Sequence, residues 1–159
     1  RLSSVIEVEE DESISSRVRF WTHSINSIKE RPILGVGIGN WRIYATKFDS
    51  NDIFSYVVPY TTHNDFLEIF SETGIFGFLS YVSFFFFIFK RNLRNFIRWI
   101  RSDSSPLHVF FLLAIIFFLI DSNINFPITR PLVQILLVLF IVTNEVLNKN
   151  KNKIENEKI

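Results

Sequence analysis

The chain has 159 residues, a formal net charge of +1, and a hydrophobic fraction of 48% that includes 19 phenylalanines. Its near-neutral charge and the acidic stretch at residues 7–12 argue against a nucleic-acid partner. The absence of cysteine excludes disulfide bonds and thiolate chemistry. The apolar content is typical of a protein embedded in a membrane.

The first predicted element is an amphipathic helix over about residues 15–31. A serine at position 13, 15 or 16 can cap its start, and the helix should end before Pro32. Its apolar residues recur every three or four positions and therefore share one face: Ile14, Val18, Trp21, Ile25 and Ile28. We expect this face to lie on the membrane or against other helices.

Arg17 lies four residues before Trp21 and so shares the edge of the apolar face. A guanidinium at this place could clamp a phosphate group at the bilayer surface, because it offers two parallel N–H donors. The alternative is an interfacial arginine whose aliphatic stem covers apolar surface while its charge stays in water.

A glycine-rich stretch follows at residues 35–41. It lacks the last spacing of a dinucleotide-binding fingerprint and no βαβ unit surrounds it, so we reject dinucleotide binding. Two interpretations stay open. The glycines could let backbone amides approach an anion, or they could form a flexible turn that returns Trp41 and Tyr44 to the membrane interface. We expect an irregular loop from here to about residue 60.

His63 is the candidate catalytic residue. Thr62 and Asp65 fit a capping box, which places His63 in the first turn of a helix. The positive end of the helix dipole favours a neutral imidazole, the form that a general base requires, and amides at this terminus favour a phosphate oxygen. The alternative is a turn or capping residue. No second histidine stands at metal-ligand spacing, so we predict no metal site.

Three apolar stretches complete the chain, at about residues 74–89, 106–122 and 131–147. Each uninterrupted apolar core is shorter than the ~20 residues that span hydrocarbon comfortably, but three in succession favour membrane helices. Gly74 and Gly77 are expected to permit close helix contact without breaking a helix that starts near His63. The polar tail at residues 148–159 is expected to be frayed or disordered.

Charge predicts the orientation of these spans. The link between the first two spans carries five basic residues against one acid: Lys90, Arg91, Arg94, Arg98 and Arg101 against Asp103. The positive-inside rule places this link and the lysine-rich tail in the cytoplasm. Residues 1–73 and the loop at 121–131 then face outward, so Asp121 and Arg130 could join His63; alternatively, Asp121 caps or pairs locally.

The predicted fold is therefore an all-α polytopic membrane protein. An outward-facing amphipathic helix and loop come first, followed by three transmembrane helices and a cytoplasmic tail. Because the chain begins without an initiator methionine or signal peptide, we expect it to be the C-terminal piece of a longer protein.

Five short motifs occur in order along the chain: Ser-Ser-Arg-x-x-Phe-Trp at 15–21, Arg-Pro-Ile-Leu-Gly-Val-Gly-Ile-Gly-Asn-Trp at 31–41, His-Asn-Asp-Phe-Leu at 63–67, Ser-Glu-Thr-Gly-Ile-Phe-Gly at 71–77 and Asn-Phe-Pro-Ile-Thr-Arg-Pro at 125–131. Over about residues 14–145 this ordered set resembles the C-terminal half of an O-antigen ligase or O-antigen polymerase family protein.

The resemblance implies a glycosyltransferase of the bacterial inner membrane that needs neither metal nor cofactor and acts on the periplasmic or exterior side. Its donor would be an undecaprenyl-diphosphate-linked glycan, and its acceptor a sugar, lipid A core or a protein. His63 matches the family histidine proposed to activate the acceptor hydroxyl, and Arg17 an arginine expected to engage the donor diphosphate. Arg130, Asn64 and Glu72 are further candidate substrate contacts, with Glu72 expected to orient or pack rather than react.

The family name covers several reactions in lipopolysaccharide and surface polysaccharide biosynthesis. We rank a polysaccharide polymerase or ligase above a protein O-oligosaccharyltransferase. A hypothesis of a different class is a non-catalytic membrane component of polysaccharide export, in which His63 only caps a helix.

Overall fold

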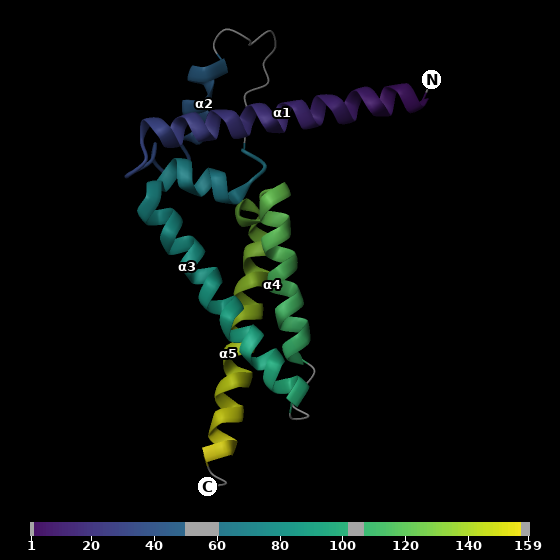
Figure 1. Cartoon of the computed structure of the whole chain (residues 1–159), viewed down its shortest axis with the longest axis vertical. Helices are drawn as coiled ribbons and strands as arrows, with labels where there is room; N and C mark the ends of the chain where they lie inside the picture. Colours follow the sequence, from purple (N-terminus) through teal and green to yellow (C-terminus); the bar gives the residue numbers. More distant parts are fainter. Residues whose placement is uncertain (1, 50–60, 102–106, 157–159) are drawn as a thin grey trace. The chain divides into compact units, whose positions relative to one another are not determined.

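The computed structural model describes residues 2–49, 61–101 and 107–156, and every regular element in this part of the chain is a helix (Figure 1). This confirms the all-α prediction. The elements are α1 (Leu2–Glu30), α2 (Trp41–Asp49), α3 (Asp65–Arg101), α4 (Leu107–Ile124), the short 3-10 helix η1 (Pro127–Thr129) and α5 (Pro131–Asn156).

The chain divides into two compact units. The first comprises Arg1–Phe86 together with Asp121–Phe126, and the second comprises Phe87–Ile120 together with Pro127–Ile159. Helix α3 contributes its first part to one unit and its last part to the other.

In the first unit, α1 packs against α2 through a small aromatic core (Figure 1). The Phe20 and Trp41 rings meet edge to face with centroids 6.1 Å apart, and His23 stacks on Phe48 at 5.7 Å. Ser24 and Ser27 are completely buried on the same side of α1. Each hydroxyl donates to the carbonyl oxygen four residues earlier, so burial leaves neither hydroxyl without an acceptor.

Two expectations about this region need correction. Helix α1 begins at Leu2, well before the predicted start near residue 15. Residues 41–49 form α2, where an irregular loop was expected. Ile14, Val18 and Ile25 of the predicted apolar face are exposed, so the contact of this face with a membrane stays a prediction. The rest of the expected loop, residues 50–60, lies outside the described residues.

The glycine loop, residues 31–40, is docked on α3 and is not a free turn. Backbone amides of Val36 and Gly37 donate to the carbonyl oxygens of Ser71 and Glu72, each at 2.9 Å. In return, the amide of Ile75 donates to the carbonyl oxygen of Pro32 at 2.9 Å. An interrupted α-helix leaves carbonyl oxygens before the break and amides after it without a partner in the helix. The carbonyl oxygens of Ser71 and Glu72 and the amide of Ile75 are such groups, and the glycine loop pairs them.

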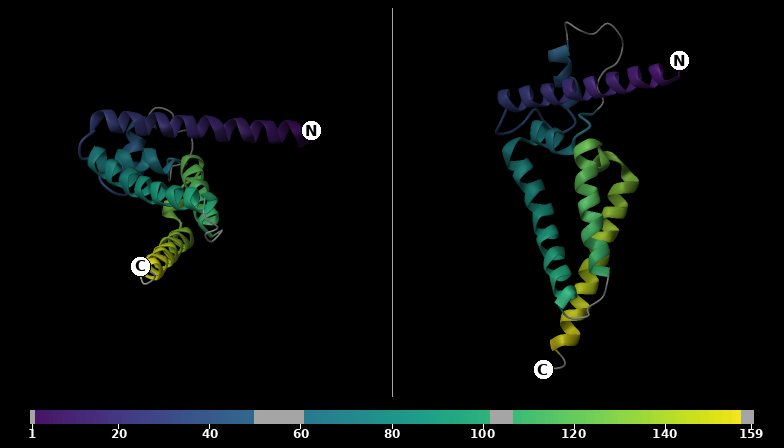
Figure 2. Two further views of the ribbon diagram at one scale, coloured as in Figure 1. Left: turned by 60° about the horizontal axis from the view of Figure 1, so that its bottom comes forward. Right: turned by 45° about the vertical axis from the view of Figure 1, so that its right-hand side comes forward.

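The interruption is at Gly74, whose φ of 67° is left-handed and lies inside α3. The prediction that Gly74 would leave the helix unbroken is therefore wrong: α3 changes direction there (Figure 2). The expected close approach does occur, but to the glycine loop. A Cβ on Gly74 would lie 2.1 Å from the carbonyl oxygen of Ile33, and one on Gly35 would lie 2.3 Å from that of Glu72.

In the second unit, buried polar side chains join the last part of α3 to α5. The amide of Asn144 donates to the side-chain oxygen of Asn92 at 2.9 Å, and both side chains are buried. Asn92 in turn donates to the carbonyl oxygen of Ile88 at 2.9 Å. Arg91 and Glu145 form an ion pair beside this contact.

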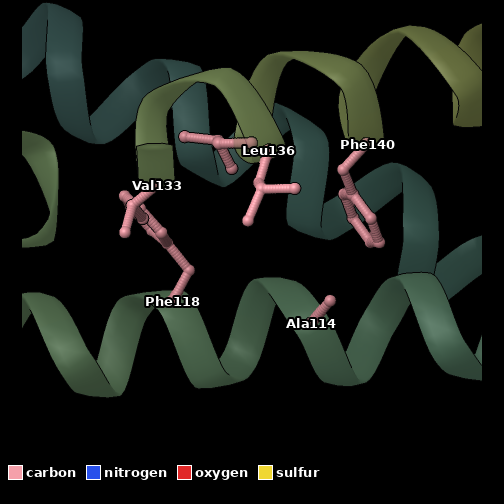
Figure 3. Close-up of a pocket in the computed structure, with 6 residues that line it drawn as sticks. Ala114, Phe118, Val133, Leu136 and Phe140 are labelled. Atoms are coloured by element: carbon pink, nitrogen blue, oxygen red, sulfur yellow. The ribbon is translucent and has the colours of Figure 1, made fainter. Parts of the chain in front are cut away.

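Helices α4 and α5 pack against each other through aromatic and aliphatic side chains. The rings of Phe111 and Phe140 meet with centroids 4.6 Å apart. Beside them lies an open apolar pocket of about 170 Å³ (Figure 3), lined by Ala114, Phe118, Val133, Leu136, Leu137 and Phe140. Helix α5 continues to Asn156, so the expectation of a frayed tail from residue 148 is wrong over that range.

Helix α3 is the one helix among the described residues that is long and apolar enough to cross a membrane. Only 17% of its most apolar window is buried, whereas the core helix of a soluble protein is mostly buried. Two shorter apolar helices, Val109–Ile124 and Pro131–Leu147, follow it. Many of their large apolar side chains are exposed, as lipid-facing side chains would be.

Candidate functional site

The centre of the candidate site is the turn at His63, immediately before α3. Asn64 is the N-cap: its side-chain oxygen accepts from the amide of Leu67 at 3.1 Å, and its carbonyl oxygen accepts from that of Glu68 at 3.0 Å. Because the helix starts at Asp65, His63 lies ahead of the first turn and not within it, contrary to the prediction.

His63 has a left-handed backbone, with a φ of 54°. It is the only residue other than glycine with a positive φ among the described residues. Such a conformation costs about 1–2 kcal/mol for a residue with a Cβ, and strained residues of this kind concentrate at functional sites. The imidazole is half-buried. The structure therefore holds this side chain in a fixed direction by constraining its backbone.

Glu68 secures the turn from the helix side. Its carboxylate accepts from the amide of Thr62 at 2.9 Å and from the hydroxyl of Thr62 at 3.2 Å. This is a capping box in function, but the acid is Glu68, not the predicted Asp65, and it reaches back across six residues. Asp65 itself is completely buried. Two carboxylates thus stand in the first turn of α3.

These carboxylates change what the start of α3 can bind. The prediction that the N-terminus of this helix binds a phosphate oxygen assumed that its backbone amides have no acidic side chain beside them. Here Asp65 and Glu68 already supply acidic groups to this terminus, and an incoming phosphate would be repelled by their negative charge. Cationic side chains are the better candidates for holding a diphosphate.

A distant segment, Asp121–Phe126, completes the surroundings of His63 within the same unit. The Phe126 ring meets the imidazole edge to face, with centroids 5.0 Å apart. The side-chain amide of Asn64 donates to the carbonyl oxygen of Asn123 at 3.2 Å. The loop therefore reaches the His63 turn through Asn123 and Phe126, while the roles of Asp121 and Arg130 in the site stay predictions. Asp121 accepts from the side chain of Asn125 at 2.5 Å, which is the local pairing that the sequence left open.

Helix α1 reaches the same turn through Trp21. Its indole N–H donates to the carbonyl oxygen of Thr62 at 3.0 Å, one residue before His63. Arg17 is half-buried and lies one helical turn before Trp21, so its Cβ points to the same side of α1. The fold therefore brings the helix that carries Arg17 to the backbone next to His63.

Glu72 and Asn64 make contacts that account for them structurally. The carboxylate of Glu72 accepts from the amide of Trp41 at 3.1 Å and so caps the start of α2. Asn64 uses its oxygen for the helix cap and its amide group for Asn123. Their roles as substrate contacts stay predictions. Arg130 belongs to the second unit, where its exposed side chain precedes α5, and its role also stays a prediction.

Sequence reasoning missed the residues that hold this site together. Trp21 was placed on an apolar face and Phe126 only in a motif, and Glu68 was not singled out. A short capping pattern can suggest the cap at residues 62–65. The contact of Trp21 with Thr62, however, joins two residues that are 41 positions apart, and the contact of Phe126 with His63 joins two that are 63 positions apart. Among the described residues, no cluster of three His, Cys, Asp or Glu side chains could hold a metal ion.

The chain matches no curated protein and no solved structure. A family model described as O-antigen ligase matches residues 1–82, a range that contains Arg17, the glycine loop, His63 and Glu72. This match covers slightly more than half of the chain and includes the whole docked assembly of α1, the glycine loop and the start of α3. The chain therefore belongs to the O-antigen ligase family.

Proposed function

We propose that the protein transfers or polymerises an undecaprenyl-diphosphate-linked glycan in the synthesis of surface polysaccharide or lipopolysaccharide. The observation that carries this proposal is the His63 turn, because a family of ligases matches a chain in which a histidine with a strained backbone directly follows Thr62, and Glu68 and Trp21 hold Thr62 in place. A histidine that served only as a helix cap would not need this position, since Asn64 already caps α3.

In the proposed reaction, the imidazole of His63 removes the proton from an acceptor hydroxyl as that oxygen attacks the anomeric carbon of the donor sugar. A new glycosidic bond forms and the bond to the lipid diphosphate breaks. Arg17 stabilises the negative charge of the departing diphosphate, which needs no metal where enough guanidinium groups surround it. Arg130 is proposed to contact the acceptor side.

The proposed membrane arrangement has α3 beyond Gly74, α4 and α5 as three spans of the inner membrane. The basic residues at the end of α3 would then be cytoplasmic, and the His63 turn would lie on the periplasmic or exterior side. The length and low burial of α3 support the first span, and the exposed apolar side chains of α4 and α5 support the other two. A polysaccharide polymerase or ligase is preferred over a protein O-oligosaccharyltransferase.

The competing proposal is a non-catalytic component of polysaccharide export, in which His63 matters only for the turn. Three substitutions separate the two. His63→Gly removes the imidazole and relieves the left-handed strain, His63→Asn removes the base but tolerates this conformation, and His63→Ala removes the base and keeps the strain.

The measurement is the surface glycan profile together with the accumulation of lipid-linked donor, in cells that express each variant at equal membrane level. General-base chemistry predicts that all three variants lose product and accumulate donor, even though the Gly variant is at least as stable as the wild type. His23→Asn, at a histidine that stacks on Phe48 away from the turn, is the control and should retain product. Normal product from the Gly and Asn variants would refute the base and support the structural role.

A further inference from the structure

The glycine loop presents apolar side chains away from the protein. Ile33 is 59% exposed, Leu34 is 79% exposed and Ile38 is 84% exposed. The intervening residues face the other way, because Gly35 is buried against α3 and Val36 is half-buried. Three large aliphatic side chains exposed within six residues form an apolar patch that water solvates poorly.

The loop has no freedom to fold back and bury these side chains. Its backbone is held by the hydrogen bonds that join Val36, Gly37 and Pro32 to residues 71–75. The glycine contacts at Gly35 and Gly74 leave no space between the two backbones for even a methyl group. The outward direction of the aliphatic side chains is therefore built into the docking and does not result from a loose loop.

The docking point indicates what covers the patch. The loop is bonded to Ile75, the first residue of the apolar part of α3 after the break at Gly74. The next residue, Phe76, is 67% exposed. The loop therefore stands beside the place where α3 enters hydrocarbon, if α3 crosses the bilayer as proposed above.

The charged residues around the patch also fit the surface of a bilayer. Lys29 and Arg31 precede it and Arg42 follows it, and all three are exposed. Of the nearby acids, Glu30 is paired with Lys47 at 2.8 Å, and the carboxylate of Glu72 accepts from the amide of Trp41 at 3.1 Å. An apolar tip flanked by cations matches a bilayer, whose acyl chains take the apolar side chains while its anionic head groups attract the cations.

We propose that the glycine loop is a membrane-inserting element, with Ile33, Leu34 and Ile38 seated in the leaflet that α3 enters. This inference rests on the proposed crossing of the membrane by α3. The inserted loop fixes the depth of the docked assembly relative to the bilayer surface. Helix α2 follows the loop directly, and the His63 turn lies eleven residues before Gly74, on the α3 side of the contact between the loop and α3. A lipid-linked donor would then meet His63 at the surface of the bilayer.

The absence of cysteine makes the test direct, because one introduced cysteine carries the only spin label. The full chain is labelled at Leu34→Cys or Ile38→Cys and reconstituted in vesicles of phosphatidylethanolamine and phosphatidylglycerol. Relaxation is measured with oxygen, which concentrates in lipid, and with a water-soluble nickel chelate. Phe76→Cys serves as the bilayer reference and Lys149→Cys, at the charged end of α5, as the water reference.

Insertion predicts that labels at 34 and 38 favour oxygen over the chelate, as the Phe76 label does, whereas the Lys149 label favours the chelate. A chelate-accessible loop with a lipid-exposed Phe76 label would overturn the insertion and leave the span intact. A water-exposed Phe76 label would instead overturn the crossing of α3. Dipolar coupling between labels at 34 that rises with protein density would show that a second copy covers the patch, and would also overturn the proposal.

A second measurement does not depend on the labels. Leu34→Glu with Ile38→Glu places two charges in the proposed inserted tip, whereas Ile43→Glu places one at another exposed isoleucine, in α2 and outside the loop. Insertion predicts that the double variant exposes residues 32–39 to proteolysis or hydrogen exchange in vesicles, while Ile43→Glu leaves them protected. Equal protection in both variants would overturn it.

Discussion

Substituting Gly35, Gly39 or Gly74 by alanine tests whether the contact between the glycine loop and α3 depends on close backbone approach or only on backbone flexibility. Gly35, Gly39 and Gly74 all have positive φ angles, of 69°, 74° and 67°. A side chain at any of them is strained by about 1–2 kcal/mol in the left-handed region. The three sites differ in space: a Cβ on Gly39 would meet nothing within 4 Å, whereas one on Gly35 or Gly74 would meet backbone.

The geometry sets the size of the difference. A Cβ on Gly74 would lie 2.1 Å from a carbonyl oxygen, and real Cβ contacts are not found under 3.0 Å, so the two backbones must separate by roughly 1 Å. The three loop hydrogen bonds near this point, each 2.9 Å long, would then be broken. At about 0.5–1.5 kcal/mol for each bond, plus the strain, Gly74→Ala should destabilise the first unit by about 3–6 kcal/mol. Gly39→Ala should cost only the strain.

The assay is thermal unfolding of the purified full chain in detergent, with Gly39→Ala as the matched control. The expected order of midpoints is wild type, then Gly39→Ala, then Gly35→Ala and Gly74→Ala together at the lowest temperature. Equal midpoints for Gly39→Ala and Gly74→Ala would refute the argument from close approach. A near-normal Gly74→Ala would show that the break in α3 is not required for the docked assembly.

Three further substitutions test single contacts. Asn144→Leu removes the amide that donates to the buried oxygen of Asn92 at 2.9 Å, and should destabilise the second unit by about 1–3 kcal/mol. Replacing both asparagines by leucine should recover most of this loss of stability. Unfolding curves that show no recovery in the double variant would contradict the role of this hydrogen bond. Trp21→Phe keeps the aromatic packing but removes the donor to Thr62, so glycan product should fall more than protein stability; unchanged product would contradict a role for α1 in holding the His63 turn. Asn64→Ala removes the cap of α3 and should cost about 1 kcal/mol in thermal unfolding, while Asn64→Asp should retain most of it; equal losses would contradict the cap.

Local patterns predicted the helical elements because they depend on neighbouring residues. The apolar stretches at about 74–89, 106–122 and 131–147 coincide with parts of α3, α4 and α5. The amphipathic spacing found α1 but not its start, and it did not identify the face that packs within the first unit. The packed face carries Ser24 and Ser27, whose small side chains allow α2 to approach closely. Hydropathy does not detect such a face, because it scores serine as polar.

The candidate site shows the same division. A histidine followed by an asparagine and acidic residues indicated a helix start, and α3 does start there. The sequence could not show that Glu68 would clamp Thr62 or that Gly74 would interrupt α3. Glu68 reaches Thr62 across six residues, farther than the spacing of a capping box, and the break at Gly74 depends on a backbone angle that several residue patterns allow.

The sequence by itself determined the class of the molecule and its candidate chemistry: an all-helical chain, three apolar stretches in succession, a family resemblance, and a histidine at the start of a helix. These follow from composition, period and short motifs, which act over a few residues. Only the tertiary structure decided that the glycine loop docks against the break at Gly74 and that Trp21 and Phe126 meet the His63 turn. The physical reason is that such contacts are selected by the simultaneous fit of several distant segments, so no local pattern encodes them alone.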